Sequence, residues 1–230
     1  MGIIDRYRVY NKDSRFLSEV VDKSIDFVIT SPPFNISHKY NSYHDSLDYN
    51  DFNDLCSTVI ASISRVLKDD GLFIVDIADM IVMDSIIIYG AEFIKDKALS
   101  VNLDFICSFP YIAVEEGDIK IKSCIPREDV NKKFHSSCEQ ILVFGKSMTQ
   151  HDVIDNIHIK PSYSYSHVQD SAFWPEDLVQ DILFPFDLNG KILLDPFMGS
   201  GTIGRMTLKR GGHFIGYDVD RETLKTYEWI

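Results

Sequence analysis

The sequence predicts an α/β fold: a Rossmann-like, doubly wound and mostly parallel sheet with helices on both faces. Short apolar segments typical of buried strands alternate along the 230 residues with segments whose apolar residues recur at helical spacing. One of these strands runs into a glycine-rich turn that opens a helix, an arrangement with which such sheets bind nucleotide-like ligands. The length is that of one domain, so we expect residues 1–230 to form a single unit.

The elements follow one another in a regular order. Strands are predicted at residues 25–30, 72–77, 103–109, 140–144, 191–194 and 213–217. Helices are predicted at residues 49–67, 80–97, 175–183 and 201–209. Asp70-Gly71 is the stop signal of the first helix, and Pro175 is expected in the first turn of the third, where its missing N–H costs nothing. Residues 146–172 are polar and irregular, which indicates a long surface excursion.

The composition narrows the class of protein. Hydrophobic residues make up 45% of the chain, which is typical of a globular domain. No apolar run is long enough to span a bilayer and no signal-peptide pattern opens the sequence, so we expect a cytoplasmic protein with no membrane partner. The four cysteines form no Cys-x-x-Cys pair and the histidines lack ligand spacing, so we expect neither a disulfide framework nor a metal site.

The charge is strongly acidic. The 23 lysines and arginines stand against 35 aspartates and glutamates, and the net charge of -12 opposes nonspecific binding to a polyanion. One basic cluster lies between two apolar segments and consists of Lys120, Lys122, Arg127, Lys132 and Lys133. This cluster is interpreted either as a phosphate-facing surface or as a solvated loop, and the sequence leaves both open.

The glycine-rich turn has the chemistry of a ligand site. Residues 195–202 read Asp-Pro-Phe-Met-Gly-Ser-Gly-Thr. Gly199 and Gly201 would let backbone N–H groups approach a ligand, and the helix N-terminus favours an anionic group such as a carboxylate. Asp195 would suit a cationic group such as an amine. The turn lacks both the GxGxxG spacing and the lysine of a phosphate-binding loop, so a phosphate cradle is disfavoured.

A second acid follows the next predicted strand. Asp218 comes 17 residues after Gly201, at the place where nucleotide-binding sheets carry an acceptor for ribose hydroxyls. Together with the turn, this acid favours a ligand that has an adenosine part and an amino-acid part.

A proline-rich motif directly follows the strand at 25–30. Residues 31–34 read Ser-Pro-Pro-Phe. The two prolines remove two N–H donors and stiffen the chain, so nearby carbonyl oxygens are held as fixed acceptors. Ser31 adds a hydroxyl and Phe34 a flat ring. Rigid acceptors beside an aromatic ring suit a base that has been turned out of its stack. Taken alone, the motif would favour a proline-rich strand terminator with a core phenylalanine.

Together the two motifs resemble the DNA methyltransferases that modify exocyclic amines. Ser-Pro-Pro-Phe resembles the catalytic motif of this family, and residues 195–202 resemble its S-adenosylmethionine motif. Their order is the circularly permuted order of the family's β group, which implies the class I methyltransferase fold. Asp13-Ser-Arg resembles the acidic position near the cofactor adenine, residues 137–146 resemble a later strand, and residues 173–178 resemble the segment that closes over the methionine end.

The resemblance assigns roles residue by residue. The catalytic residues that it implies are Ser31, Pro32, Pro33 and Phe34. The cofactor-binding residues that it implies are Asp13, Phe173, Pro175, Asp195, Pro196, Phe197, Gly199, Ser200, Gly201, Thr202 and Asp218. The implied reaction is direct displacement, in which the amine of a flipped base attacks the sulfonium methyl of S-adenosyl-L-methionine.

Substrate and partners are expectations of the same kind. Serine at the first motif position resembles the cytosine N4 enzymes more than the adenine N6 enzymes. Double-stranded DNA is the expected partner, with residues 115–135 and 146–172 as candidate DNA-facing loops. A homodimer is implied by analogy, and a restriction enzyme or specificity partner is possible because no separate recognition domain is visible. The alternatives are an RNA or other planar-amine methyltransferase, and an inactive nucleic-acid-binding subunit.

Overall fold

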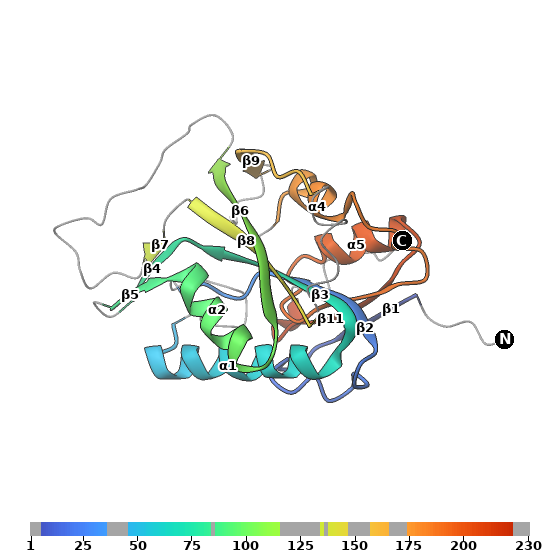
Figure 1. The fold of residues 1–230 in the computed structure, drawn as a ribbon, viewed down its shortest axis with the longest axis horizontal. Coiled ribbons are helices and arrows are strands. Elements are labelled where there is room, and N and C mark those ends of the chain that lie inside the picture. Colours follow the sequence, from blue (N-terminus) through green and yellow to red (C-terminus); the bar gives the residue numbers. More distant parts are fainter. Residues whose placement is uncertain are drawn as a thin grey trace.

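A computed structural model describes residues 6–35, 46–83, 86–115, 134–135, 138–146, 157–165 and 174–222 (Figure 1). The strands are β1 Tyr7–Tyr10, β2 Ile25–Thr30, β3 Leu67–Ala78, β4 Met80–Met83, β5 Ile86–Tyr89, β6 Asp104–Glu115, β7 Phe134–His135, β8 Cys138–Gly145, β9 Ser162–Tyr165, β10 Ile192–Asp195 and β11 His213–Tyr217. The helices are α1 Tyr49–Val66, α2 Gly90–Ser100, α4 Glu176–Leu183 and α5 Thr202–Lys209.

The main sheet has eight strands in the order β1-β11-β10-β2-β3-β8-β6-β9. Strands β1, β11, β10, β2 and β3 are parallel to one another. Strand β8 pairs antiparallel with both β3 and β6, and β9 is parallel to β6, so within this sheet β8 alone is reversed. The predicted mostly parallel α/β sheet is therefore confirmed.

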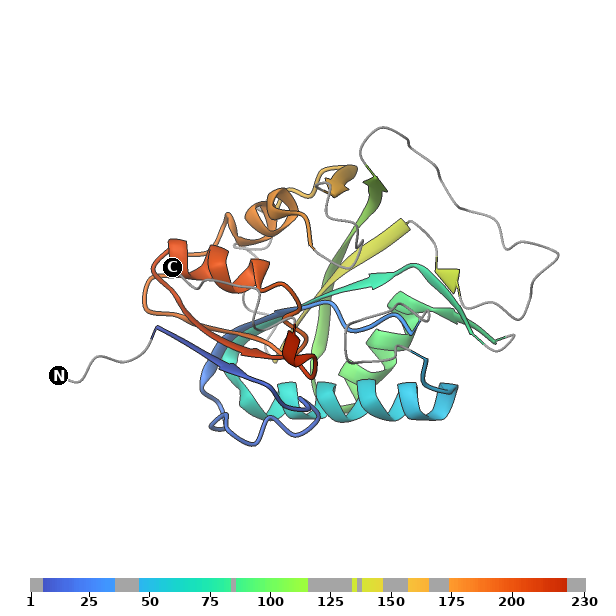
Figure 2. The same ribbon diagram turned by 180° about the vertical axis from the view of Figure 1, so that it is seen from behind.

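Helices cover both faces of the sheet (Figures 1 and 2). One core cluster joins α1 and α2 to the sheet and includes Phe52, Ile63, Phe73, Ile94 and Phe144. The other lies under α4 and α5 and includes Leu178, Ile182, Leu193, Ile203 and Phe214. The near-continuous burial of β3 and β10 is what a strand covered on both faces requires.

The chain changes direction between two neighbouring strands, β10 and β2. After β10 it passes through α5 and returns as β11, whereas after β2 it passes through α1, on the opposite face, and returns as β3. Such a switch point, at the carboxyl ends of the strands, is where doubly wound sheets bind ligands. The motifs at residues 31–34 and 195–202 follow these two strands directly.

The helix predicted at residues 80–97 is wrong in its first half. Those residues form the strands β4 and β5, which pair antiparallel, and β7 adds to β4 to complete a second, three-stranded sheet. The runs Met-Ile-Val-Met and Ile-Ile-Ile-Tyr are rich in β-branched side chains, which are restricted in a helix and pack well on a pleated surface. The helix starts only at Gly90, whose N–H donates to the Asp79 carbonyl.

Other elements differ in extent or were not predicted. Strand β3 begins at Leu67, where the first helix was expected to end, and β6 reaches Glu115. Strands β1, β7 and β9 were not predicted. Within the expected excursion at 146–172, the structure describes residues 146 and 157–165, which include β9, paired with β6. Residues 147–156 and 166–172 lie outside the described ranges. No helix in the described part of the chain is long and apolar enough to cross a membrane.

Candidate functional site

The candidate site lies at the edge of the sheet where β1, β2, β3, β10 and β11 all end. Because these strands are parallel, the residues that follow them meet at this edge. Asp195 closes β10, Ser31 follows β2, and Asp218 follows β11. The two motifs, far apart in the sequence, therefore lie side by side.

Asp195 is a deeply buried acid of this edge, with 2% of its surface exposed. Its Oδ1 accepts hydrogen bonds from the Thr30 hydroxyl at 2.6 Å and from the Phe197 N–H at 3.0 Å. Burial raises the pKa of Asp195 to about 7, against the effect of both hydrogen bonds, and the nearby Asp218 adds to the rise. A buried acid with so perturbed a pKa indicates a functional site, where a cationic ligand group would favour its ionised form.

The turn after Asp195 presents backbone at close range. Gly199 and Gly201 have φ angles of 44° and 70°, and a Cβ built on Gly199 would meet no atom within 4 Å. Gly201 caps α5, and its N–H donates to the Met198 carbonyl at 2.7 Å. The Arg205 guanidinium donates to the Ser200 carbonyl at 2.6 Å and so holds the turn to the first helical turn. The turn is therefore open at Gly199, but the N–H groups of Gly199 and Gly201 both donate within the protein, to Asp218 and Met198, and are not free donors for a ligand.

Asp218 has two roles in the structure. Its Oδ2 accepts the Gly199 N–H at 2.9 Å, and its Oδ1 accepts the Asp220 N–H at 2.7 Å. Burial raises the pKa of Asp218. Asn11, just after β1, donates from its side chain to the Asp218 carbonyl at 2.9 Å, so the end of β1 joins the same edge.

Asp13 is exposed and engaged in an ion pair. Both its carboxylate oxygens bind Arg15, with guanidinium contacts of 2.9 and 2.7 Å and a backbone contact of 2.8 Å. Although partial burial opposes ionisation, Arg15 holds the pKa of Asp13 below its ordinary value. The Ser62 hydroxyl anchors this loop to α1 by donating to the Arg15 carbonyl.

The proline motif leaves β2 beside Asp195. Pro32 is buried, while Ser31, Pro33 and Phe34 are half-buried, and Phe34 packs against the α1 core cluster. The following residue, Asn35, is fully buried and has a φ of 56°. Its side chain donates to the Leu47 carbonyl and accepts the Leu47 N–H, both at 2.7 Å. Asn35 thus ties the end of the motif to the segment that leads into α1.

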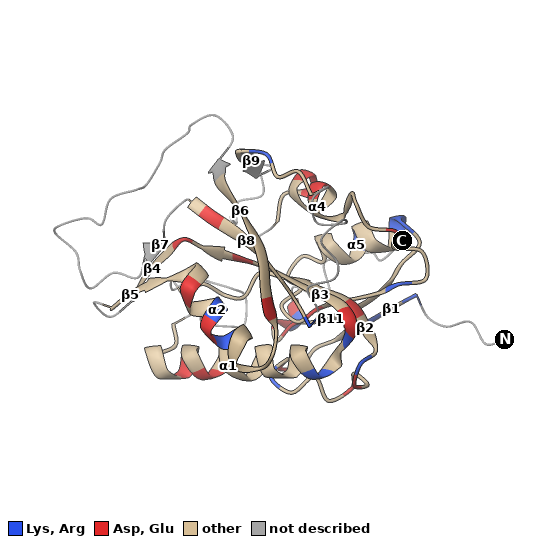
Figure 3. Ribbon diagram, viewed as in Figure 1, with Lys and Arg blue, Asp and Glu red and all other residues tan. Residues whose placement is uncertain are grey.

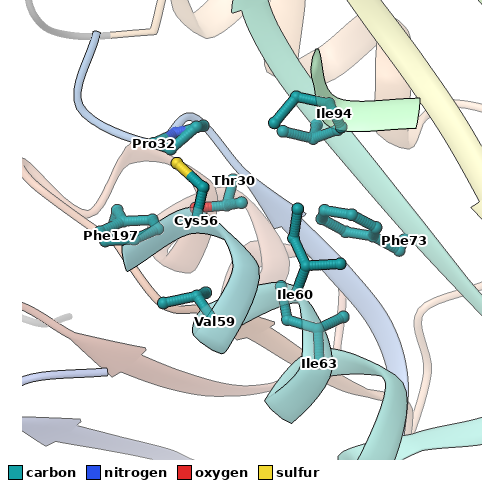
Figure 4. Close-up of a pocket in the computed structure, with 10 residues that line it drawn as sticks. Thr30, Pro32, Cys56, Val59, Ile60, Ile63, Phe73, Ile94 and Phe197 are labelled. Carbon is teal, nitrogen blue, oxygen red and sulfur yellow. The ribbon is translucent and has the colours of Figure 1, made fainter. Parts of the chain in front are cut away.

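A small apolar cavity lies behind the motif, between it and α1 (Figure 4). Thr30 and Pro32 line it on one side, Phe197 on another, and Cys56 of α1 points its thiol toward Pro32. Burial raises the pKa of Cys56 to about 12, so this thiol is not a nucleophile. The cavity holds no polar group suited to a cofactor, and it backs the motif without forming the site.

An unpredicted cluster of buried acids lies on the neighbouring strands. The Tyr111 hydroxyl on β6 donates to Asp76 of β3 at 2.9 Å and also contacts the Glu139 carboxyl of β8. A phenol has one hydrogen, so the second contact requires a proton on a carboxyl group. Burial raises the pKa of Asp76 well above its ordinary value, and Glu139 raises it further. Thr30 lies opposite Val75 in the parallel pairing of β2 with β3, so the residues that follow them, Ser31 and Asp76, lie at corresponding positions along the two strands.

The remaining predicted residues lie beside the glycine turn, at the start of α4, or outside the described ranges. Pro175 is buried and is the N-cap of α4. It therefore lies one residue before the first helical turn, in which the sequence had predicted it. Thr202 opens α5, and its hydroxyl contacts that of Ser200 at 3.0 Å. Pro196 is buried in the turn. Phe173 and the basic cluster, Lys120, Lys122, Arg127, Lys132 and Lys133, lie outside the described residues.

In the view of Figure 3, the described lysines and arginines are spread over several elements, with aspartate and glutamate between them. Among the described residues no group of three or more histidines, cysteines or acids could hold a metal ion. Sequence reasoning gave no role to Thr30, Asn35, Tyr111 or Glu139. Asp76 carried a signal, because an acid inside an otherwise apolar strand is rarely buried without a partner.

Comparison with known proteins gives a consistent picture. A family model described as DNA methylase, N6_N4_Mtase, matches residues 25–228. Type II methyltransferase M.BglII of Bacillus subtilis is 23% identical, with 94% of this chain and 66% of the relative covered. DNA adenine methyltransferase YhdJ of Escherichia coli K12 is 25% identical, with 91% of this chain and 76% of the relative covered. The chain thus spans 66% to 76% of these relatives' own length.

Solved structures share the fold. PvuII DNA methyltransferase, cytosine-N4-specific, superposes with a TM-score of 0.65 at 17% identity, covering 95% of this chain and 83% of that one. TTHA0409 of Thermus thermophilus, in complex with S-adenosyl-L-methionine, gives a TM-score of 0.64 at 18% identity, covering 95% and 92%. The Rossmann-like class predicted from the sequence is therefore confirmed.

Proposed function

This chain belongs to the DNA methylase family that acts on exocyclic amines, and we propose that it methylates the N4 amine of a flipped cytosine in preference to the N6 amine of adenine. S-adenosyl-L-methionine is the cofactor of this family, and solved neighbours hold it. The observation that carries the proposal is the placement of Ser31 and Asp195 on adjacent strand ends at the switch point of the sheet.

The residues present fit this cofactor. Asp195 offers a buried carboxylate for a cationic amine, and the turn through Gly199 and Gly201 offers open space at Gly199. Asp218 offers acceptors for ribose hydroxyls. Asp13, Pro175, Phe173, Pro196, Phe197, Ser200 and Thr202 complete the proposed set. When bound, the cofactor supplies an activated methyl group on a sulfonium.

The catalytic motif acts on the amine. The nitrogen lone pair is conjugated with the ring of the base, so the amine is a weak nucleophile. Hydrogen bonds from the amino group to the Ser31 hydroxyl and to a carbonyl near Pro32 would draw the nitrogen toward tetrahedral geometry. Phe34 would support the flipped base, and Asn35 would hold the motif in place through Leu47. Most of the rate gain would come from aligning the amine with the methyl group.

The choice of cytosine rests on Ser31, because serine at this position resembles cytosine N4 enzymes. Both specificities occur among the relatives, as the names of YhdJ and PvuII methyltransferase state. Double-stranded DNA is the proposed substrate. The net charge of -12 favours a partner that adds phosphate contacts, such as a second copy, a specificity subunit or an associated restriction enzyme.

The test is transfer of a labelled methyl group from S-adenosyl-L-methionine to mixed-sequence double-stranded DNA, followed by nucleoside digestion and mass analysis. We expect N4-methylcytosine, and Ser31→Ala should lower the rate at least roughly 10-fold while cofactor affinity is kept. Ser100→Ala is the control, because its hydroxyl donates to the Lys97 carbonyl at the opposite edge of the sheet. N6-methyladenine would overturn the choice of base. Methylation of RNA alone, or cofactor binding without any transfer, would overturn the DNA proposal.

A further inference from the structure

The hydroxyl of Thr30 lies between the two motifs. Thr30 is the last residue of β2, directly before Ser31, and is 1% exposed. Its Oγ1 donates to Asp195 Oδ1 at 2.6 Å, across 165 positions of sequence. The strands β2 and β10 are paired in parallel, with Leu194 opposite Val28, so the backbone fixes the distance between these two side chains. This contact is a direct link between the catalytic strand and the proposed cofactor acid.

The hydrogen-bond donors to Asp195 explain why the contact with Thr30 affects the orientation and the ionisation of this carboxylate. Oδ1 accepts both the Thr30 hydroxyl and the Phe197 N–H, whereas Oδ2 accepts no hydrogen bond from the described part of the chain. In that part, no lysine or arginine pairs with Asp195, and the charge of Asp218 opposes its ionisation. The two donors on Oδ1 are therefore what this chain supplies to orient the carboxylate and to favour its charged form.

We propose that Thr30 is a positioning residue for the cofactor: its hydroxyl holds the Asp195 carboxylate so that Oδ2 meets the cationic amine of S-adenosyl-L-methionine. This inference rests on the proposed function. Burial brings the pKa of Asp195 to about 7, so its ionisation near neutral pH depends on each donor that it keeps. Loss of the Thr30 hydroxyl removes one interaction that lowers this pKa, and the charged form then requires a higher pH.

The test is the pH dependence of cofactor affinity, measured by calorimetry on the full chain from pH 6 to 9. In the wild type, affinity should rise with pH as Asp195 ionises, and fall again where the α-amino group of the cofactor loses its proton, at about pH 8. Thr30→Val keeps the shape of the side chain and removes its donor. We expect the rising part of its profile to move up by about one pH unit, so that its affinity falls about tenfold at pH 6 and about fivefold at pH 7.

Two further variants separate positioning from packing. Thr30→Ser keeps a hydroxyl and should restore the wild-type profile. Thr207→Val is the matched control, because Thr207 is also fully buried and its hydroxyl donates only within α5, to the Ile203 carbonyl at 2.8 Å. If Thr30→Val folds poorly, Thr30→Cys, with its weaker donor, should give a smaller shift in the same direction.

The outcomes are distinct. A Thr30→Val profile that coincides with the wild type, or that falls equally at every pH, overturns the role of Thr30 while the cofactor proposal stands. A Thr30→Ser profile that follows Thr30→Val has the same meaning. Absence of cofactor binding by the wild-type protein at every pH would instead overturn the proposed function and, with it, this inference.

Discussion

The Asp218 carboxylate accepts the backbone N–H of Gly199 at 2.9 Å, so the acid proposed to bind ribose also fixes the glycine turn. The other carboxylate oxygen accepts the Asp220 N–H at 2.7 Å. Each oxygen is therefore already used once by the protein, and ligand hydroxyls would have to use the remaining lone pairs.

Replacing Asp218 with asparagine should affect the turn as well as the ligand. Asparagine has one acceptor oxygen, so either the Gly199 or the Asp220 N–H loses its partner. We expect cofactor affinity to fall at least tenfold and the free energy of unfolding to fall by about 1 kcal/mol. Calorimetric binding and thermal unfolding measure the two effects. Wild-type stability with reduced affinity would mean that Asp218 serves the ligand alone.

Asp195 should make the cofactor-free protein less stable as pH rises. In the unfolded chain this carboxyl loses its proton near its ordinary pKa of 3.8, but in the folded protein it keeps the proton up to a pKa of about 7. Between these values the folded state binds more protons, so its stability decreases with pH and the loss is complete above pH 7. Asp195→Asn should abolish cofactor binding. Between pH 4 and pH 8, its free energy of unfolding should rise relative to that of the wild type by a few kcal/mol.

Denaturant unfolding of the cofactor-free protein at several pH values gives this difference. A constant difference between Asp195→Asn and the wild type across that range would contradict the raised pKa. Asp181→Asn is a control, because this residue lies on α4 and pairs with Lys160 at 3.6 Å, away from the sheet edge.

Asn35 should matter for catalysis more than its position in a connection suggests. Asn35→Ala removes both hydrogen bonds to Leu47 and puts alanine at a φ of 56°. We expect a loss of about 2–3 kcal/mol in stability and at least tenfold in methyl-transfer rate, because the motif loses its anchor. Asn102→Ala isolates the backbone cost, since Asn102 has a φ of 61° beyond the end of α2, and activity should be unchanged. Equal effects of the two variants on rate would exclude the anchoring role.

The buried acids on β3 and β8 should make stability depend on Tyr111. Tyr111→Phe leaves two buried carboxyl groups without their shared hydroxyl, and we expect a loss of about 1–3 kcal/mol. Because the pKa of Asp76 is raised in the folded state, stability decreases as pH rises toward that pKa, and the variant should suffer most at alkaline pH. Tyr49→Phe, at the start of α1, is the control. A deficit that shrinks at alkaline pH would contradict the assignment.

The sequence was informative where one signal dominated. Strands β2 and β11 match their predicted bounds, and α1 and α5 agree to within one residue, because their apolar patterns are clear and a glycine turn precedes α5. The stop signal predicted at Asp70-Gly71 is wrong, because α1 ends at Val66 and these two residues lie inside β3. The helix predicted from Met80 failed because the two short apolar runs at 80–83 and 86–89 fit a buried helix and a pair of strands equally well by periodicity. The two runs pair with each other, and β4 also pairs with the distant β7, a contact that periodicity does not show.

The sequence predicted the two motifs of the site, but not the residues that hold these motifs in place through hydrogen bonds. Ser31 and Asp195 belong to recognisable patterns, and the structure places them on neighbouring strands. Thr30 and Tyr111 act through hydrogen bonds whose partners depend on register, and register is fixed only when the sheet assembles. Asn35 acts through a contact with Leu47 in the connection to α1, which no local pattern marks. An acid such as Asp76 inside an apolar strand is the kind of signal that a sequence does carry for such a support.

The order of the strands also determines when the protein acquires its site during synthesis. Strand β2 pairs with β3, which is synthesised soon after it, and with β10, which is synthesised much later. Strand β1 pairs with β11, the last strand of the sheet to be synthesised. At ribosomal rates, Asp195 follows Ser31 by roughly 10 to 30 s. Throughout that interval the growing chain carries the proline motif with no glycine turn beside it, so a nascent chain can acquire the proposed site only after residue 195 has been made.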